Sequence, residues 1–293
     1  MKILIIICIH FSLLFCQTLK ADNIMSTSNQ RYEIGLKNLK YIDQEAGERV
    51  LESLSDISPD LGKYIIEYAF GDVYNRKGLD LKSKEIAVVA ALTAMANVEP
   101  QLKVHMHGAL NVGCNIAEVQ EVILQMSAYS GFPSSINGMM ALKEVLKERK
   151  SEGKKDKKGI IQSSPIPKDT TRYEYGSEKL KMLSKSQVEI LEQTFKDVSP
   201  DMAKFVVEYG FSDIFARPAL DSKHREIATI AALTAMGNAP SQLKFHIKAA
   251  LNIGVSQVEI REIMILMSVY AGFPSAINGT IALKEVIKME IED

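Results

Sequence analysis

The 293-residue sequence has little cysteine, only Cys8, Cys16 and Cys114, and no two of these form a Cys-x-x-Cys pair. It also lacks a Gly-x-Ser-x-Gly turn and a glycine-rich phosphate loop after a strand. These absences argue against dithiol redox chemistry, α/β-hydrolase chemistry and phosphate-loop nucleotide binding. The few histidines have no cysteine or carboxylate at metal-ligand spacing, so we expect no metal site and no other cofactor.

The net charge is also small, because 35 basic side chains face 36 acidic ones and the isoelectric point is near 6.6. A dedicated nucleic-acid binder usually carries a basic face, so we expect no nucleic-acid partner. A hydrophobic content of 46% with 24% charged residues indicates a globular chain, and its length suggests about two domains.

Residues 1–21 have the pattern of a secretory signal peptide. A basic start precedes an apolar run over 3–15, and Ala21 is a small residue after which cleavage can occur. The run is shorter than the roughly 20 residues that span a bilayer. We therefore expect export to the periplasm or exterior and no stable membrane span. A lipid anchor on Cys16 and the absence of export are the alternatives. Cleavage would leave Cys114 as the single cysteine, without an internal disulfide.

Most of the remaining chain consists of two tandem copies of one module, at an offset of 141 residues. The copies, 31–147 and 172–288, align without a gap, and both open on Arg-Tyr-Glu-x-Gly. A period this long indicates duplicated domains and not a solenoid of short repeats. The intervening residues, 148–171, are rich in lysine, glycine, serine and proline and predict a solvated linker. A basic segment that contacts an acidic surface is the alternative.

The apolar residues of each copy recur at helical spacing, and no run with the period of a strand is present. Serines before prolines predict capping hydroxyls, at Ser58 and Ser199, and aspartates predict further caps, at Asp80 and Asp221. Two segments resemble capping boxes: Asn115 with Glu118, and Ser256 with Glu259. The first copy predicts helices over 60–74, 82–97 and 100–111, a fourth opening at 115 and a last one ending near 147, and the second copy repeats them 141 residues later. Each copy is therefore expected to be all-α.

One histidine and one glutamate keep their spacing in both copies. His105 and His246 lie in the same Gln-Leu-Lys-x-His motif, and each follows a glutamate, Glu85 or Glu226, by 20 residues. Two antiparallel helices joined by a short turn can bring the carboxylate against the imidazole. Such a pair can transfer protons, because the carboxylate fixes the tautomer and moves the imidazole pKa. Packed histidines and surface salt bridges from the glutamates to nearby lysines are the alternative.

Six further residues are candidates for substrate binding: Arg76 and Arg217, Asn111 and Asn252, and Tyr129 and Tyr270. An arginine in the loop before a capping aspartate can bind a carboxylate bidentately, or it can tie down helix ends. The asparagines can contact a ligand or hold a helix end. The tyrosines can present a hydroxyl to a pocket or pack in the core.

Three segments of each copy carry a resemblance to the carboxymuconolactone decarboxylase family. They are residues 68–80, 102–113 and 129–137 in the first copy and 209–221, 243–254 and 270–278 in the second. The resemblance implies two tandem helical modules with the alkylhydroperoxidase D-like fold. It also implies assembly into rings, commonly hexamers of single modules. A fused pair is then expected to form a homo-oligomer, a trimer of chains with six modules.

The resemblance implies one of two chemistries. In the lyase branch, carbon dioxide is removed from a carboxylated muconolactone; a cation to bind carboxylates and a proton donor are roles that fit the arginines and the histidines named above. The alkylhydroperoxidase D branch uses a Cys-x-x-Cys pair before the histidine. Those positions hold Val98 and Gln101 in the first copy, and Ala239 and Gln242 in the second. The missing thiols oppose disulfide-cycling peroxidase activity.

The sequence thus predicts a cofactor-free lyase that acts on a small carboxylated lactone or a related carboxylic acid by proton transfer. Two alternatives remain open. A thiol-dependent antioxidant enzyme would use Cys114, although the second copy has Val255 there and an incidental small residue is the preferred interpretation. A non-catalytic, ligand-binding ring would retain the fold without the chemistry.

Overall fold

The computed structural model describes residues 28–42 and 46–292, which form helices joined by turns and loops, with no strand in these ranges. The all-α prediction is confirmed for them. The signal-peptide prediction concerns residues 1–21, which lie outside the described residues. Within the described ranges, no helix combines the length and the apolar character that a membrane crossing requires.

The two copies contain the same elements in the same order, except that the 3₁₀-helix of the first copy has no separate counterpart in the second. The first has α1 (Ser28–Ile42), α2 (Ala46–Leu54), α3 (Pro59–Tyr64), the π-helix η1 (Ile65–Val73), α4 (Leu81–Met95), α5 (Glu99–Asn111), α6 (Ile116–Gln125), the short 3₁₀-helix η2 (Met126–Ala128) and α7 (Phe132–Ser151). The second has α8 (Arg172–Leu183), α9 (Gln187–Phe195), α10 (Pro200–Phe205), the π-helix η3 (Val206–Phe215), α11 (Ser222–Met236), α12 (Pro240–Asn252), α13 (Gln257–Tyr270) and α14 (Gly272–Glu292).

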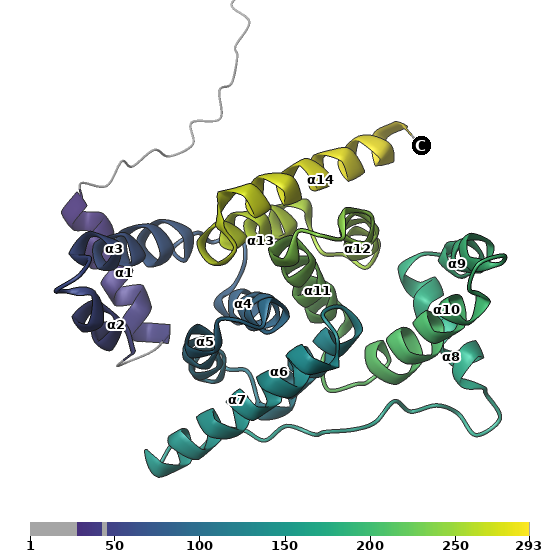
Figure 1. The fold of residues 1–293 in the computed structure, drawn as a ribbon, viewed down its shortest axis with the longest axis horizontal. Helices are drawn as coiled ribbons and strands as arrows, with labels where there is room; N and C mark the ends of the chain where they lie inside the picture. The colour runs from purple at the N-terminus through teal and green to yellow at the C-terminus, as the bar shows by residue number, and fades with distance from the viewer. Residues whose placement is uncertain (1–27, 43–45, 293) are drawn as a thin grey trace, which may run out of the picture.

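Helices α4 and α11 pack against each other at the centre of the molecule (Figure 1). Both are rich in alanine and are buried around nearly their whole circumference, from Ser83 to Ala94 in α4 and from Arg225 to Thr234 in α11. A helix that is apolar on all sides is stable only when it is enclosed. The two modules therefore share one core across this contact.

Two arms lie at opposite ends of the molecule, with α4 and α11 between them (Figure 1). We call α1–α3 with η1 the first arm and α8–α10 with η3 the second arm. Each arm also contacts the other module: Tyr68 Oη lies 2.6 Å from Ser268 Oγ, and Tyr209 Oη lies 2.6 Å from Ser127 Oγ. The modules are therefore interlocked at both ends.

The repeated Arg-Tyr-Glu-x-Gly motif is explained by how the first helix of each arm crosses the π-helix. A side chain at Gly35 would place its Cβ 2.0 Å from Ile66 O, and one at Gly176 would place it 2.2 Å from Val207 O. Only glycine permits this approach. The motif arginine of the first module adds an ion pair, from Arg31 to Asp72 on η1.

The predicted caps are confirmed in part. Asp80 and Asp221 accept hydrogen bonds from backbone amides three residues later, at 3.0 and 2.9 Å, and both predicted capping boxes are present. The prediction of capping hydroxyls at Ser58 and Ser199 was wrong, because neither side chain makes a cap hydrogen bond. Ser58 has φ −156° and ψ 70°, outside the extended conformation that directs an N-cap side chain to the helix.

The chain between the copies does not run free of the fold. Helix α7 continues to Ser151 and α14 to Glu292, beyond the predicted ends near 147 and 288. After α7, Lys157 O and Lys158 O accept hydrogen bonds from the first two amides of α6, at 2.9 and 3.0 Å. Amides at the start of a helix have no partner within the helix, and this backbone supplies one. Residues 150–171 are otherwise exposed or half-buried.

Candidate functional site

The first composite site consists of Glu85, His105, Tyr74 and Tyr270. The spacing of 20 residues places Glu85 on α4 and His105 on α5, with Glu85 Oε2 2.8 Å from His105 Nδ1. The glutamate is fully buried and the histidine nearly so. Because a carboxylate only accepts, Nδ1 donates this hydrogen bond, and Nε2 is an acceptor whenever the ring carries a single proton.

Two tyrosines complete this site, one from each module. Tyr74 Oη donates to Glu85 Oε1 at 2.9 Å, and Tyr270 Oη lies 2.9 Å from Tyr74 Oη. The Tyr270 ring stands edge-on to the His105 ring, with centroids 4.9 Å apart. Burial and the charge of Glu85 raise the pKa of both phenols well above the usual range, so both hydroxyls stay protonated at neutral pH.

The second composite site consists of Glu226, His246, Tyr129 and Phe215, and its hydrogen bonds differ. His246 Nδ1 lies 2.9 Å from Glu226 Oε2, as in the first site. Here, however, the tyrosine of the other module contacts the imidazole directly, with Tyr129 Oη 3.2 Å from His246 Nε2. Phe215 stands where Tyr74 stands in the first copy and has no hydroxyl to offer, and Glu226 Oε1 is buried without a hydrogen-bond partner.

A buried polar chain positions the Tyr129 hydroxyl. Thr229 opposes the rise of the Tyr129 pKa, Gln125 Nε2 donates to Thr229 Oγ1 at 2.8 Å, and Arg225 Nη1 donates to Gln125 Oε1 at 2.9 Å. Burial, and secondarily the charge of Glu226, raise the Tyr129 pKa well above its usual value. The positions equivalent to Thr229, Gln125 and Arg225 hold Val88, Leu266 and Lys84. The first composite site therefore has no equivalent chain and holds Tyr270 through Tyr74 instead.

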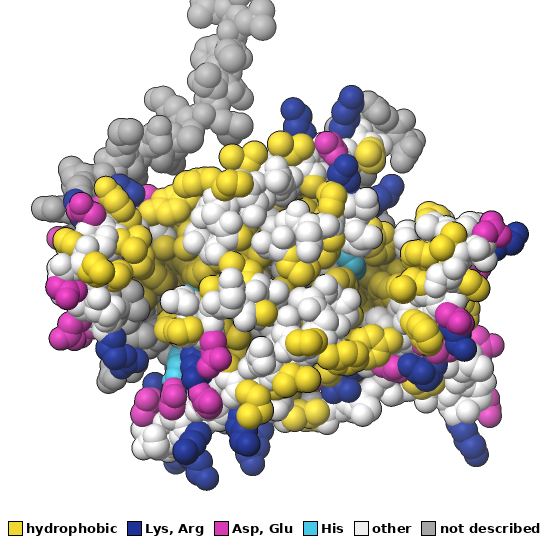
Figure 2. Space-filling view, in the orientation of Figure 1, with side chains coloured by type: hydrophobic (Ala, Val, Ile, Leu, Met, Phe, Trp, Pro, Cys, Tyr) yellow, Lys and Arg dark blue, Asp and Glu magenta, His cyan; other side chains and the backbone are white. Residues whose placement is uncertain are grey.

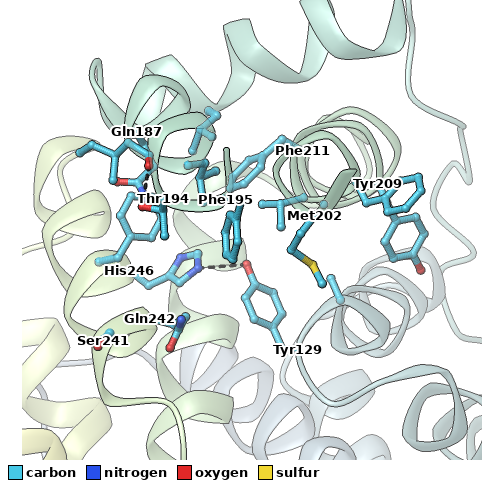
Figure 3. A pocket seen from close by; sticks show the side chains of 18 of the residues that line it. Tyr129, Gln187, Thr194, Phe195, Met202, Tyr209, Phe211, Ser241, Gln242 and His246 are labelled. Atoms are coloured by element: carbon cyan, nitrogen blue, oxygen red, sulfur yellow. Dashed lines mark hydrogen bonds between the residues drawn. The ribbon is translucent and has the colours of Figure 1, made fainter. Parts of the chain in front are cut away.

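A cavity of about 860 Å³ opens beside the second composite site (Figure 3). Its walls come from the second arm, from the start of α12 and from the η2–α7 turn of the first module. His246 and Tyr129 line it together with Ser241 and Gln242, and most of the remaining wall is aliphatic or aromatic. No lysine, arginine, aspartate or glutamate is among the described residues that line it. This volume and lining suit a small, largely apolar molecule.

Arg76 and Arg217 do not line this cavity; each binds a carboxylate of the other module. Arg76 Nε and Nη2 donate to Glu262 at 2.6 and 2.8 Å, and Arg217 Nε donates to Glu121 at 2.8 Å. Glu121 also accepts from the fully buried Arg225 at 2.8 Å. The geometry thus gives both predicted substrate arginines the tasks of holding the two modules together.

The two candidate asparagines hold the ends of helices. Asn111 Nδ2 donates to Ile42 O, the last residue of α1, at 2.7 Å, and Asn252 Nδ2 donates to Leu183 O, the last residue of α8, at 2.8 Å. Carbonyls at the end of a helix lack partners within it, so these bonds fasten each arm to its module. The structure therefore brings together the glutamates, histidines and tyrosines, but not the asparagines.

Cys114 is unsuited to thiol chemistry. It is buried, and burial, with the nearby Glu118 charge, raises its pKa to about 12. The reactive thiolate is then scarce at neutral pH, which opposes the antioxidant alternative. In the part of the chain that the structure describes, no group of three or more histidine, cysteine or acidic side chains is placed to hold a metal ion.

Sequence reasoning missed Tyr74, Phe215, Thr229 and the two interface glutamates. Tyr74 and Phe215 carry a visible signal, because this repeat position keeps an aromatic ring in both copies but has a hydroxyl in only one. Glu121 and Glu262 also recur at the repeat offset. Their partners come from the other module, however, and a repeat alignment does not show contacts between copies.

Known proteins are similar to this chain in the same two copies. The model of the carboxymuconolactone decarboxylase family matches residues 59–144 and again 200–285, together more than half of the chain. The 4-carboxymuconolactone decarboxylase of Acinetobacter baylyi is 32% identical over 120 residues, which cover 41% of this chain and 89% of that protein.

More distant relatives bear other names. A nitrosuccinic acid decarboxylase of Metarhizium robertsii is 32% identical over 84 residues, covering 29% of this chain and 58% of that protein. Peroxisomal protein 2 of Saccharomyces cerevisiae is 28% identical over 104 residues, covering 35% of this chain and 36% of that protein. Together with the double match of the family model, these similarities confirm the resemblance seen in the sequence: the chain belongs to the carboxymuconolactone decarboxylase family.

Proposed function

We propose that the protein is a cofactor-free carboxy-lyase that acts on a small carboxylated lactone or a related carboxylic acid. Two relatives are named as decarboxylases of different acids, which supports decarboxylation as the reaction class and leaves the acid open. The observation that carries the proposal is the meeting of His246 and Tyr129 in the wall of a mainly apolar cavity, with Glu226 behind the imidazole.

The reaction needs little more than this arrangement. The bond between the substrate carbon and its carboxylate breaks, carbon dioxide leaves, and the electron pair stays on the substrate as an enolate or carbanion that must take up a proton. The proton shared between Tyr129 Oη and His246 Nε2 can be delivered to that carbon. Glu226 accepts from Nδ1 and so keeps Nε2 directed to the cavity.

The apolar wall assists the same step. A carboxylate in the cavity loses hydration, whereas the transition state disperses its charge over the leaving carbon dioxide and the substrate. An environment without compensating cations therefore destabilises the ground state more than the transition state. The first composite site has the same Glu–His pair, so the test of the reaction removes both histidines.

We also propose that the chain is exported and assembles as a trimer of chains with six modules. Large apolar side chains are exposed at repeated positions of both modules, and Figure 2 shows hydrophobic groups over much of the visible face. They are Leu61, Tyr64, Phe132, Ile136 and Met140, with Met202, Phe205, Phe273, Ile277 and Ile281 as their counterparts. Repeated apolar patches of this kind support association of copies.

The test is release of carbon dioxide from a panel of carboxylated lactones and ring carboxylic acids. The whole chain should turn over at least one member, and the double variant His105→Ala/His246→Ala should lose that turnover while keeping its helicity. His107→Lys is the matched control, because the second copy already has Lys248 there. Unchanged turnover in the double variant would remove the histidines from the mechanism. Binding of panel members without any turnover would favour the non-catalytic ring.

A further inference from the structure

We propose that each chain has one ligand site and not two: the second composite site binds a monocarboxylic acid with a bulky apolar ring, and the first does not. The claim about the ligand rests on the proposed function for its class of substrate. The claim about the number of sites rests on differences between the two copies alone.

The first difference is the state of the hydrogen bonds around each histidine. In the first composite site, the Tyr74 hydroxyl bonds both Glu85 and Tyr270, at 2.9 Å each, so the tyrosine of the other module is engaged away from the imidazole Nε2. In the second composite site, Phe215 leaves Tyr129 on His246 Nε2. Only the second site therefore presents a hydroxyl and an imidazole nitrogen to a ligand as a pair.

The second difference lies at the start of the helix that carries each histidine. Helix α12 opens on Pro240 and Ser241, with no acidic residue in its first turn, and Ser241 and Gln242 both line the cavity. Helix α5 opens on Glu99 and Pro100 at the equivalent positions. The first free amides of a helix favour an anion. Each helix loses one first-turn amide to a proline, Pro100 or Pro240, but only α5 carries a negative charge there, on Glu99, and that charge opposes an anion.

The cavity wall then sets the kind of acid. His246, Gln242 and Ser241 lie together on α12, whereas Met202 and Tyr209 lie across the cavity on the second arm (Figure 3). One carboxylate can accept hydrogen bonds from Ser241 and Gln242 at the start of α12, next to the Tyr129–His246 pair, and the ring of the ligand then lies against the apolar wall. A second carboxylate would be buried without a cation, which is costly. The site therefore selects a monocarboxylate over a dicarboxylate of similar size.

Calorimetric titration of the whole chain tests this with two non-reacting probes, 1-naphthoate and naphthalene-1,4-dicarboxylate. We expect one 1-naphthoate per chain and binding of the dicarboxylate at least tenfold weaker. Pro240→Glu, which copies Glu99, should weaken 1-naphthoate binding about tenfold, whereas Glu99→Gln should leave it unchanged. Ile190→Arg places a cation on the cavity wall and should strengthen dicarboxylate binding about tenfold; arginine is the residue that the first copy has at the equivalent repeat position, Arg49.

Met182→Arg is the matched control for Ile190→Arg, because Met182 is an exposed apolar residue of the same arm that does not line the cavity. Two 1-naphthoate molecules per chain, no 1-naphthoate binding, or equal effects of the two arginine variants would each overturn the proposal. These results are independent of turnover. A chain that binds one 1-naphthoate but decarboxylates nothing contradicts the proposed function and still supports one ligand site per chain.

Discussion

Tyr74 and Phe215 occupy the same position of the repeat, and the one hydroxyl that distinguishes them changes the hydrogen bonds of both composite sites. Tyr74 satisfies Glu85 Oε1 and engages Tyr270, whereas Phe215 leaves Glu226 Oε1 without a partner. A buried, unpaired carboxylate oxygen costs stability, so the second site is maintained at an energetic disadvantage. Such a disadvantage is common where function constrains the residues.

Removal of the hydroxyl at Tyr74 and addition of one at Phe215 should change the free energy of unfolding in opposite directions. Tyr74→Phe removes the partner of buried Glu85 Oε1 and should lower the free energy of unfolding by about 1–3 kcal/mol. Phe215→Tyr can supply a partner to Glu226 Oε1 and should raise it, by about 1 kcal/mol. Urea denaturation of both variants against the unchanged chain gives these values. Two variants that both destabilise by the same amount would contradict the assignment of the orphan oxygen.

The Tyr129 hydroxyl should matter to catalysis more than the Tyr270 hydroxyl. Tyr129→Phe removes the proton donor beside His246 and should lower kcat about 10²-fold, as expected for loss of one general acid–base group. Tyr270→Phe should lower it much less, because that hydroxyl bonds Tyr74. Steady-state kinetics on the substrate found by the panel provides the comparison. Equal losses in both variants would indicate that the two sites act alike.

Removal of the interface glutamates should destabilise the chain unequally. Glu121 pairs with Arg217 and with the fully buried Arg225, whereas Glu262 pairs with Arg76, whose side chain is 44% exposed. Glu121→Ala leaves a buried guanidinium without its carboxylate and should cost about 3–5 kcal/mol. Glu262→Ala should cost clearly less, because water can reach Arg76. Thermal or urea unfolding measures both, and a larger loss for Glu262→Ala would refute this ranking.

Lys84 should make stability depend on pH in the alkaline range. Burial lowers its pKa from 10.5 to about 8 in the folded chain, while Glu262 opposes the shift. Between these pH values the unfolded chain holds the proton and the folded chain has lost it, so a rise in pH favours folding. The unfolding free energy of the unchanged chain should therefore rise relative to that of Lys84→Met from pH 8 to pH 10, by at most about 1.4 kcal/mol per pH unit.

The comparison with Lys84→Met isolates this group, because the other titrating side chains are common to both proteins. Lys84 also donates to Tyr74 O and Arg76 O, at 2.7 and 2.6 Å, so Lys84→Met should be less stable than the unchanged chain near pH 7. The pH-dependent difference adds to this loss. Parallel pH profiles of the two proteins would show that Lys84 does not titrate in this window.

Much of the helical architecture could be predicted because its signals are local. Asp80, Asp221 and the two capping boxes mark helix starts within a few residues, and apolar spacing marks the faces. The packing of the arms could not be predicted, because its signal is not local. Gly35 and Gly176 recur because the backbone of a neighbouring helix contacts them, and only the folded chain reveals this contact. The π-helices escaped prediction for a related reason, since the apolar spacing there looks α-helical.

The candidate site likewise has one part that the sequence predicts and one part that it does not. The Glu85–His105 and Glu226–His246 pairs follow from a fixed spacing on adjacent helices, so the sequence could indicate them. The contacts of Arg76 and Arg217 could not be assigned, because their partners lie on the other module. That each histidine receives its tyrosine from the other copy likewise depends on how α4 packs against α11.

The central claim is that the second composite site performs the proton transfer, and His246→Ala tests it most directly. Release of carbon dioxide from the best substrate of the panel should fall at least 100-fold in this single variant, with an unchanged circular dichroism spectrum. Turnover within twofold of the unchanged chain would contradict the account.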